Sequence, residues 1–213
     1  MKNRKGIFWI LLGLLLLVAA LSLTAYNVYD ARRAEKAANL AISRLEELIP
    51  TQPPTNPAEL PTQVPTVPVE IPDYVLNPQM PMPETEIDGE TYIGTLQIPA
   101  LGLNLPVISQ CSYPKLKIAP NRYFGSAYLD NLVIAGHNYD CFFGGLSTLS
   151  PGDTVRFTDL DGNVFDYEVV AMEALKVTAI EEMLSPEYDL TLFTCNTSLS
   201  RRITVRCERI GES

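Results

Sequence analysis

The sequence predicts a mainly β fold that closes, or nearly closes, into a barrel. Residues 87–213 are long enough for one compact core, and about seven short runs of strand pattern divide them, separated by tight turns. These runs are Tyr92–Ile98, Asn104–Ser109, Leu132–Ala135, Thr154–Thr158, Val164–Met172, Asp189–Thr194 and Ile203–Glu208. A hairpin turn signal, Asp161-Gly162-Asn163, joins the fourth run to the fifth. Short helices are expected at Ser112–Ile118 and Ile180–Leu184.

An apolar run near the N-terminus predicts a membrane anchor. Basic residues at positions 2, 4 and 5 precede a run from Ile7 to Tyr26 that holds no charge. About 20 residues span roughly 30 Å as a helix, the thickness of the hydrocarbon core of a bilayer. The basic residues favour an N-terminus in the cytoplasm and a single-pass protein with its bulk outside the cell. A cleaved signal peptide is the alternative, but its apolar region is normally shorter, and Leu23 breaks the small-residue pattern before a cut after Ala25.

Composition divides the chain into four parts. Residues 1–28 form the basic tip and the transmembrane anchor. Residues 29–49 are helix formers and predict a juxtamembrane stalk, mainly solvated, with apolar positions near helical spacing at Ala34, Ala37, Leu40, Ala41, Leu45 and Leu48. Residues 50–86 hold most of the 17 prolines and predict an extended linker. Residues 87–213 form the folded domain.

The charge and the cysteine pattern exclude several classes of function. With 16 Lys+Arg against 25 Asp+Glu, the formal charge is −9, so the protein is not expected to bind nucleic acid. One histidine and the absence of a C-x-x-C pair argue against a zinc cluster and a thioredoxin-type site. We predict no metal and no cofactor. Glu181, Glu182 and Glu187 could supply an acidic cluster for calcium, but such residues are usually solvated.

Three residue types with catalytic chemistry stand at the ends of predicted strands. His137 follows the run Leu132–Ala135 and a glycine, and Cys195 ends the run from Leu190. A thiol in such a position acts as a nucleophile when its thiolate is stabilised. Arg201 and Arg202 begin the next strand, so a hairpin returns one guanidinium beside the cysteine. Taken singly, each residue is as readily explained by packing or by solvation.

Together these segments resemble the signature of the sortase transpeptidases. The resemblance is carried by Thr191-Leu192-Phe193-Thr194-Cys195, by Arg202-Ile203-Thr204-Val205 after it, and by Ile134-Ala135-Gly136-His137-Asn138 upstream. Leu149-x-x-Gly152-Asp153-x-Val155-x-Phe157 also looks like a strand entry of this family. The resemblance covers the whole region after the linker, and the basic and apolar N-terminus fits it as well.

The resemblance implies a closed eight-stranded β-barrel and a cysteine transpeptidase on the surface of Gram-positive cells. Cys195 would attack a C-terminal sorting motif of a secreted protein to give a thioacyl-enzyme. An amine of a cell-wall precursor or a pilin lysine would then take the acyl group. His137 would act as general acid and base. Arg202, rather than Arg201, would stabilise the oxyanion, because it begins the family's strand pattern. Asn138 and Thr194 would contact the substrate.

The subclass stays open in the sequence. Gly136-His137-Asn138 is similar to class B members, but the segment from Val169 to Asp189 is too short for their helical insert. No Asp-Pro-aromatic lid motif precedes the barrel, and no second apolar span follows it, which disfavours a pilin-polymerising class C enzyme. A class B-like, a class D-like and a housekeeping enzyme remain.

The remaining cysteines and two rival functions complete the expectations. Cys111 and Cys141 either form a disulfide or stay free, and Cys207 should be buried. The main rival is a catalytically inactive, membrane-anchored β-barrel that only binds a partner. A cysteine peptidase of the cell wall is the second, but the commonest such fold places its cysteine before its histidine, the reverse of the order here.

Overall fold

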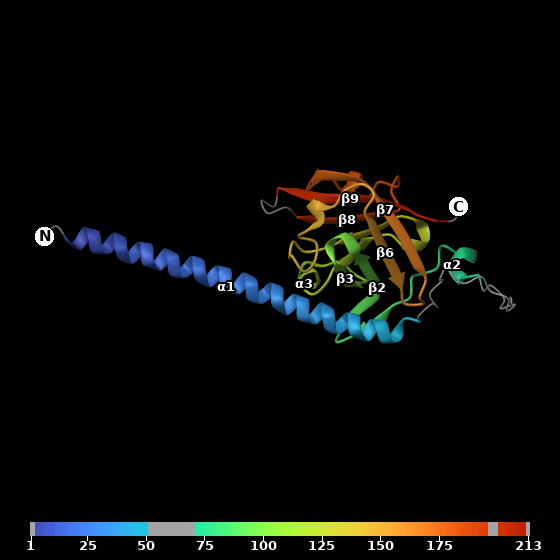
Figure 1. Cartoon of the computed structure of the whole chain (residues 1–213), viewed down its shortest axis with the longest axis horizontal. Helices are drawn as coiled ribbons and strands as arrows, with labels where there is room; N and C mark the ends of the chain where they lie inside the picture. Colours follow the sequence, from blue (N-terminus) through green and yellow to red (C-terminus); the bar gives the residue numbers. More distant parts are fainter. Residues whose placement is uncertain (1–2, 51–70, 196–199, 212–213) are drawn as a thin grey trace.

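A computed structural model describes residues 3–50, 71–195 and 200–211 (Figure 1). Nine strands form one sheet in the order β1-β2-β3-β4-β5-β8-β9-β7-β6, and a pairing of β6 with β2 closes it. Eight strands therefore make a ring, with β1 outside it, and the predicted eight-stranded barrel is confirmed. The strands are β1 (Thr85–Ile87), β2 (Glu90–Ile98), β3 (Leu103–Ile108), β4 (Asn121–Phe124), β5 (Leu132–Ala135), β6 (Thr154–Asp159), β7 (Val164–Lys176), β8 (Leu190–Cys195) and β9 (Arg201–Arg209).

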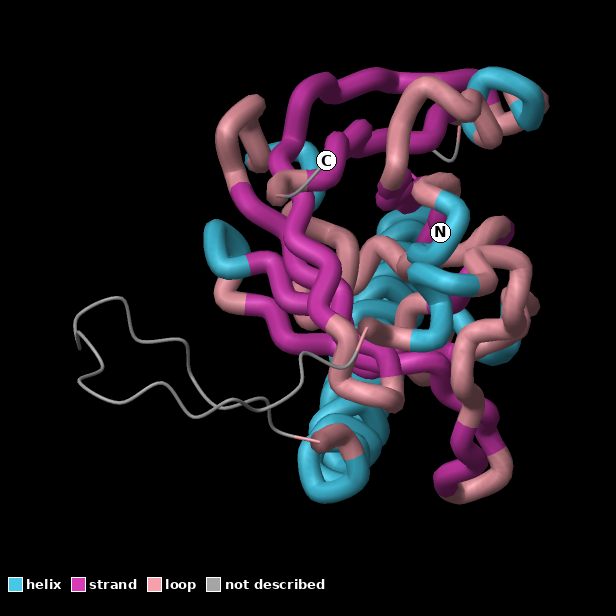
Figure 2. The backbone as a smooth tube through the Cα atoms, turned by 90° about the vertical axis from the view of Figure 1, so that its right-hand side faces the viewer, coloured by secondary structure: helices cyan, strands magenta, loops and turns pink. Residues whose placement is uncertain are grey.

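The helices are few and, apart from the first, short. They are α1 (Asn3–Leu48), α2 (Asp73–Leu76), α3 (Tyr113–Leu116) and α4 (Ile180–Met183), with 3-10 turns η1 (Pro99–Leu101), η2 (Ala127–Leu129) and η3 (Leu146–Thr148). The described part of the chain has one helix, α1, that is long and apolar enough to cross a membrane. Figure 2, which looks nearly along α1, shows the strands curving round the core and α1 lying against one side of the barrel.

Side-chain alternation along the strands builds two apolar layers. In β5 and β8, the residues Leu132, Ile134, Leu190 and Leu192 point into the main core, inside the ring. The intervening residues Val133, Ala135 and Phe193 face outward and form a second cluster with Met183 of α4. The outer layer is apolar because α4 and its flanking segment cover the outer face of these strands. β5 and β8 are thus buried on both sides, which explains why their sequences are almost continuously apolar.

One ring strand, β4, is absent from the sequence prediction. Its four residues, Asn-Arg-Tyr-Phe, lack the apolar alternation by which the other seven are recognised. The strand forms because its neighbours require it: β4 pairs with β3 on one side and β5 on the other. Its first residue, Asn121, is fully buried and donates from Nδ2 to the carbonyl oxygen of Ala119 at 3.0 Å.

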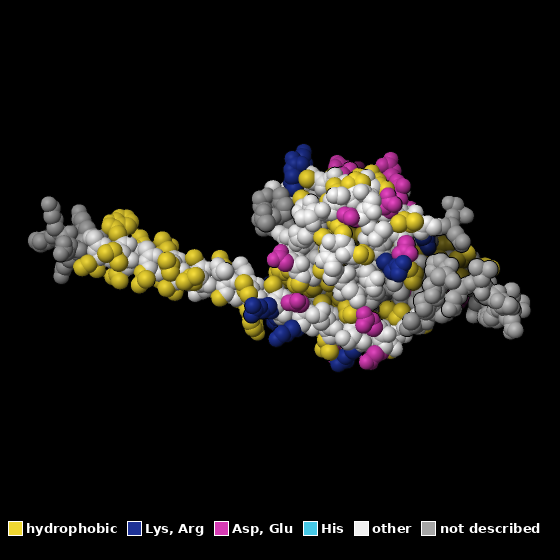
Figure 3. All heavy atoms as spheres, viewed as in Figure 1, with side chains coloured by type: hydrophobic (Ala, Val, Ile, Leu, Met, Phe, Trp, Pro, Cys, Tyr) yellow, Lys and Arg dark blue, Asp and Glu magenta, His cyan; other side chains and the backbone are white. Residues whose placement is uncertain are grey.

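The apolar half of α1 and its docked half differ in their surroundings. The helix has 46 residues, about 69 Å at 1.5 Å per residue. Its N-terminal half carries exposed large apolar side chains, from Ile7 to Tyr26. Figure 3 shows this apolar surface ending where dark-blue side chains begin, near the junction with the barrel. Arg32, Arg33 and Lys36 are the exposed basic residues of this stretch.

The expected solvated stalk is wrong, because the second half of α1 packs on the barrel. Ala34, Ala38, Ala41, Ile42 and Leu45 are buried, at a spacing that gives one helix face. The alanines let the helix backbone approach the sheet closely, and the last turns join a cluster with Ile87, Tyr92 and Ile108. Leu40 and Leu48, which belong to the same apolar pattern in the sequence, are exposed.

The predicted linker is also shorter than residues 50–86. Residues 51–70 lie outside the described part of the chain. From Asp73 onward the chain belongs to the folded unit: the ring of Tyr74 stacks on that of Tyr128, with centroids 4.7 Å apart. Met82 is buried in the main core, and β1 pairs with β2. Aromatic and apolar contacts at positions 74 and 82 outweigh the extended preference of the flanking prolines.

Candidate active site

Three neighbouring strands bring the predicted catalytic residues to one end of the barrel. β5 and β8 are parallel, with Ala135 paired to Phe193, and continuing this register sets position 137 level with position 195. β8 and β9 are antiparallel, with Cys195 paired to Arg202. Neighbouring strands lie about 4.8 Å apart. Cys195 and Arg202 therefore lie on adjacent strands, and His137 lies in the loop that directly follows the neighbouring strand β5.

Gly136 allows the chain to turn at the end of β5 and present His137. The backbone N–H of Gly136 still donates to the carbonyl oxygen of Phe193 at 3.0 Å, so the parallel pairing lasts up to this residue. A Cβ at position 136 would lie 2.3 Å from the Phe143 ring. Only glycine lets Phe143 pack this closely. The N–H of Phe143 in turn donates to the carbonyl oxygen of His137 at 3.2 Å, which closes the loop after the strand.

The imidazole of His137 is held by aromatic contacts. Its ring is stacked on Tyr139, with centroids 4.0 Å apart and an interplanar angle of 18°. The ring of Tyr113 in α3 lies 6.3 Å from the imidazole, centroid to centroid. The Nδ1 atom is buried and has no hydrogen-bond partner among the described residues. Burial, and then the nearby Lys117 cation, lower the pKa of His137 below its usual value, while the Asp30 carboxylate acts in the opposite direction.

Two nitrogen atoms of the Arg202 guanidinium have no hydrogen-bond partner among the described residues. Its Cζ lies over the Phe193 ring, 5.0 Å from the centroid. Its Nε and Nη1 are buried and have no acceptor in the described residues. Arg201, one position earlier, is exposed and donates from Nη1 to the carbonyl oxygen of Ala174 at 2.9 Å. The two arginines therefore differ in the way that strand alternation predicts.

The other predicted site residues flank these positions. Thr194 is 3% exposed, and its Oγ1 is buried without a hydrogen-bond partner among the described atoms. Asn138 follows His137 and is half-buried. Cys195 is the last residue of β8. Its side chain and residues 196–199 lie outside the described part of the chain, so the prediction for the thiol stays a prediction.

Arg206, which the sequence analysis did not single out, holds α4 against the outer face of the barrel. The side chain is 1% exposed. Its Nε donates to Glu173 at 3.0 Å, and its Nη1 donates to Thr191 Oγ1 at 3.0 Å and to the carbonyl oxygen of Met183 at 3.1 Å. Arg206 thus stabilises the segment that backs Phe193 and hence Arg202. Its alternation with Arg202 along β9 is the one clue that it faces the same way.

The three remaining cysteines are free thiols in the structure. Cys111 is exposed, Cys141 is half-buried, and Cys207 is buried as predicted. Burial raises the pKa of Cys207 to about 12, so this thiol is protonated and unreactive at neutral pH. The three glutamates Glu181, Glu182 and Glu187 are exposed. Within residues 3–50, 71–195 and 200–211, no group of His, Cys, Asp and Glu has a geometry that could hold a metal ion.

Comparison with known proteins identifies this fold and its sequence pattern. Residues 96–210 match the family described as Sortase domain. Sortase A from Corynebacterium diphtheriae superposes with a TM-score of 0.51 at 22% identity, over 58% of this chain and 63% of that one. Sortase C1 from Streptococcus suis superposes with a TM-score of 0.50 at 26% identity, over 57% of this chain and 74% of that one. A Clostridium perfringens sortase D5 transpeptidase superposes with a TM-score of 0.51 at 20% identity, over 56% of this chain and 79% of that one.

These matches fix the fold and leave the subclass open. The three structures carry the class letters A, C and D, and their TM-scores lie within 0.01 of one another. The match with the Corynebacterium diphtheriae sortase A spans less than two thirds of that chain. No curated protein matches the sequence.

Proposed function

This chain belongs to the sortase family, and from that premise we propose that it is a membrane-anchored cysteine transpeptidase. The observation that carries the proposal is the pairing of Cys195 with Arg202, whose buried Nε and Nη1 have no acceptor within the described residues. Buried guanidinium N–H groups without acceptors are costly. A substrate carbonyl oxygen seated between the two residues would supply the missing acceptor.

In the proposed first half-reaction, the Cys195 thiolate attacks the carbonyl carbon of a peptide bond in a sorting motif. The C–S bond forms and the carbonyl oxygen becomes an oxyanion, to which Arg202 donates hydrogen bonds. The C–N bond then breaks, and the His137 imidazolium gives its proton to the leaving amine. The products are a thioacyl-enzyme, neutral His137 and a free peptide fragment.

In the second half-reaction, neutral His137 removes a proton from an incoming amine, which attacks the thioester carbonyl. A new amide bond forms, the C–S bond breaks, and Cys195 leaves as a thiolate beside a protonated His137. The starting ionisation state is thereby restored, and no external oxidant, reductant or cofactor is consumed. Water in place of the amine would give hydrolysis by the same route.

The lowered pKa of His137 sets the resting state of this pair. At neutral pH a half-buried imidazole whose pKa is lowered from its usual value is mostly uncharged, so the competent thiolate–imidazolium form is a minor fraction. Binding of the peptide would exclude water and place its carbonyl against Arg202. The guanidinium would then favour the thiolate and the oxyanion alike.

We propose that the enzyme acts at the outer face of the cell membrane. Support comes from α1, whose apolar half is long enough to cross a bilayer, and from the basic residues that precede that half. The secreted protein with its sorting motif and the amine of a cell-wall precursor or pilin would be the two substrates. Asn138 and Thr194 would contact the motif beside His137 and Cys195.

Product analysis tests the proposal directly. The full chain in detergent is incubated with a library of sorting-motif peptides, with and without triglycine, and the products are separated by chromatography. We expect a peptide–triglycine amide from at least one motif, and slower hydrolysis of the same motif when triglycine is left out. Cleavage whose rate and products are unaffected by triglycine would indicate a peptidase. No cleavage of any motif would favour the inactive binding module.

A further inference from the structure

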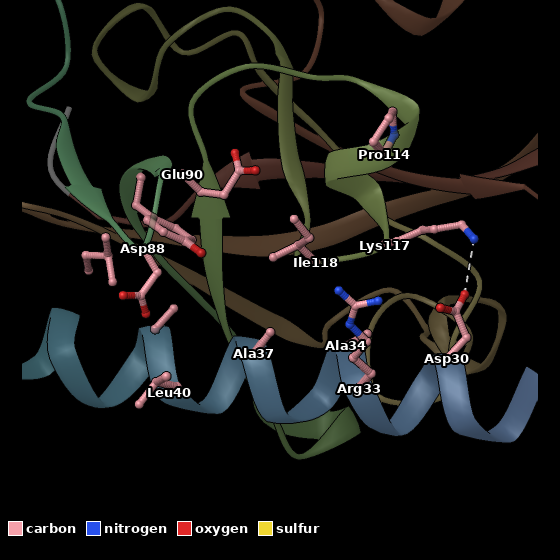
Figure 4. Close-up of a pocket in the computed structure, with 13 residues that line it drawn as sticks. Asp30, Arg33, Ala34, Ala37, Leu40, Asp88, Glu90, Pro114, Lys117 and Ile118 are labelled. Atoms are coloured by element: carbon pink, nitrogen blue, oxygen red, sulfur yellow. Dashed lines mark hydrogen bonds and ion pairs between the residues drawn. The ribbon is translucent and has the colours of Figure 1, made fainter.

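A carboxylate of the membrane helix bonds to the loop that carries His137. Asp30 lies on α1, where its Oδ2 accepts hydrogen bonds from the Tyr139 hydroxyl at 2.6 Å and from Lys117 Nζ at 3.2 Å. Figure 4 shows Lys117 reaching from the barrel towards Asp30 on the helix. A further contact joins the same two segments, from Cys141 Sγ to the carbonyl oxygen of Ala31 at 3.7 Å.

The Tyr139 ring transmits this contact to the imidazole. Its face is stacked on His137 at 4.0 Å, and its other neighbour, Phe142, lies 6.0 Å away. Burial and the hydrogen bond to Asp30 raise the pKa of Tyr139 above its usual value, so its hydroxyl stays a donor at neutral pH. With its hydroxyl held by Asp30, the ring is fixed in position and in the direction of its long axis. The imidazole stacked on the ring is held in place with it.

Within the described residues, no hydrogen bond orients His137 at Nδ1. A catalytic histidine commonly donates one ring N–H to a carboxylate or carbonyl, which fixes its tautomer and its orientation. Here the buried Nδ1 has no partner among the described residues. Among the described side chains, the contacts that orient the imidazole are the rings packed on it, of which Tyr139 is the nearest and most nearly parallel.

Asp30 also compensates a cation beside the imidazole. Among the described side chains, the groups that face His137 are Tyr113 and Lys117 from the α3 region, Tyr139 from its own loop, and Asp30 from α1. Lys117 disfavours the imidazolium, and Asp30 favours it. Since the two form an ion pair at 3.2 Å, loss of Asp30 would leave the Lys117 charge uncompensated.

We infer that Asp30, on the membrane helix, is a positioning residue for His137, acting through the Tyr139 ring. Asp30 follows Tyr26, the end of the apolar run, by about 6 Å along the helix axis. The active site is therefore held just outside the bilayer, and the docking of the anchor helix is part of what makes it competent. The inference rests on the function proposed above, in which His137 transfers the protons.

The test uses the only histidine of the chain as its own reporter. The full chain in detergent gives one imidazole resonance, whose titration is followed by NMR in wild type, Asp30→Asn and Tyr139→Phe. Asp30→Asn is expected to lower the titration midpoint by about half a pH unit or more, because Lys117 loses its partner. Tyr139→Phe keeps the stacked ring and removes only its hydroxyl, so it should move the midpoint less.

Turnover provides the second measurement. Both variants should lose roughly five- to tenfold in kcat with little change in KM for the peptide, because neither residue contacts the substrate. Asp30→Glu should recover part of the loss. The matched control is Asp88→Asn, which breaks another contact between α1 and the barrel, the Arg44–Asp88 pair at 3.4 Å. It should leave both the midpoint and kcat unchanged.

Two outcomes would overturn the inference. One is a wild-type midpoint and a wild-type kcat in both Asp30→Asn and Tyr139→Phe. The other is an equal loss in Asp88→Asn, which would assign the effect to helix docking in general. The NMR titration needs no turnover, so it separates the two proposals: an inactive wild type refutes the transpeptidase function, while the midpoint still decides the role of Asp30.

Discussion

Cys195, the last residue of β8, is paired directly with Arg202 of β9. The pairing is a consequence of one antiparallel ladder, in which every residue from Leu190 to Cys195 has a fixed partner between Cys207 and Arg202. A nucleophile and its oxyanion donor would thus be positioned by the same backbone hydrogen bonds. His137 follows two residues after the end of the neighbouring parallel strand β5, whose register with β8 is fixed up to Ala135.

The two adjacent arginines give the sharpest test of this geometry. Replacement of Arg202 by Gln should reduce kcat/KM by about a hundredfold or more, since it removes a preorganised cation from the oxyanion position. Replacement of Arg201 by Gln should change it less than about threefold, because Arg201 is exposed and bonds the carbonyl oxygen of Ala174. Steady-state kinetics on both variants decides the matter. A larger effect at position 201 would reverse the assignment.

Gly136→Ala should damage both stability and activity. The added Cβ would lie 2.3 Å from the Phe143 ring, so either that ring or the turn before His137 must move. We expect a loss of about 1–3 kcal/mol in unfolding free energy and a fall in kcat. Gly145→Ala is the control in the same loop, where the nearest atom is a flexible Leu101 methyl at 3.3 Å. Urea unfolding compares the two, and equal stabilities would contradict the packing argument.

Arg206 should contribute more to stability than any exposed ion pair. Arg206→Met removes a buried cation from Glu173, Thr191 and two carbonyl oxygens of the α4 segment, and should cost about 3 kcal/mol. Arg156→Met breaks the exposed pair with Asp166 and should cost less than about 1 kcal/mol. Chemical unfolding of both variants checks the order. Similar costs would show that the Arg206 network adds little.

The lowered pKa of His137 predicts how stability depends on pH. Burial, and secondly Lys117, disfavour the charged ring in the folded state, so the unfolded chain binds the extra proton more readily. Folding stability should therefore fall as the pH drops below about 6.5, the ordinary value for histidine. His137→Gln lacks this penalty, so its stability relative to wild type should rise between pH 7.5 and 5.5. A constant difference over that range would contradict the shift.

Local patterns in the sequence are sufficient for most of the barrel. Several features can be recognised from a few neighbouring residues: the apolar runs of β5 and β8, the Asp161-Gly162-Asn163 turn and the alternation of β9. β4 could not be predicted in this way, because its four residues show no periodic apolar pattern. Its strand conformation depends on pairing with β3 and β5, which lie elsewhere in the sequence. Cys195 and Arg202 lie at strand ends and His137 closely follows one, so their places in the fold could be predicted from the sequence.

The docking of α1 has no local signature. Its buried face consists largely of alanines, which are equally common in a solvent-exposed helix. The surface on which it packs is formed by residues more than 40 positions away in the sequence. The same reason hides Asp30 and Arg206. Each is a charged residue whose role depends on what lies opposite it in three dimensions: Tyr139 and Lys117 for Asp30, and Glu173 with the α4 carbonyls for Arg206.

Intact-mass spectrometry of the full chain, mixed briefly with sorting-motif peptides and no amine, tests the central claim most directly. The account predicts a wild-type adduct equal to the acyl fragment of one motif, absent in Cys195→Ala and discharged as an amide when triglycine is added. An adduct that survives Cys195→Ala would contradict the claim that Cys195 carries the acyl group. So would peptide turnover by that variant.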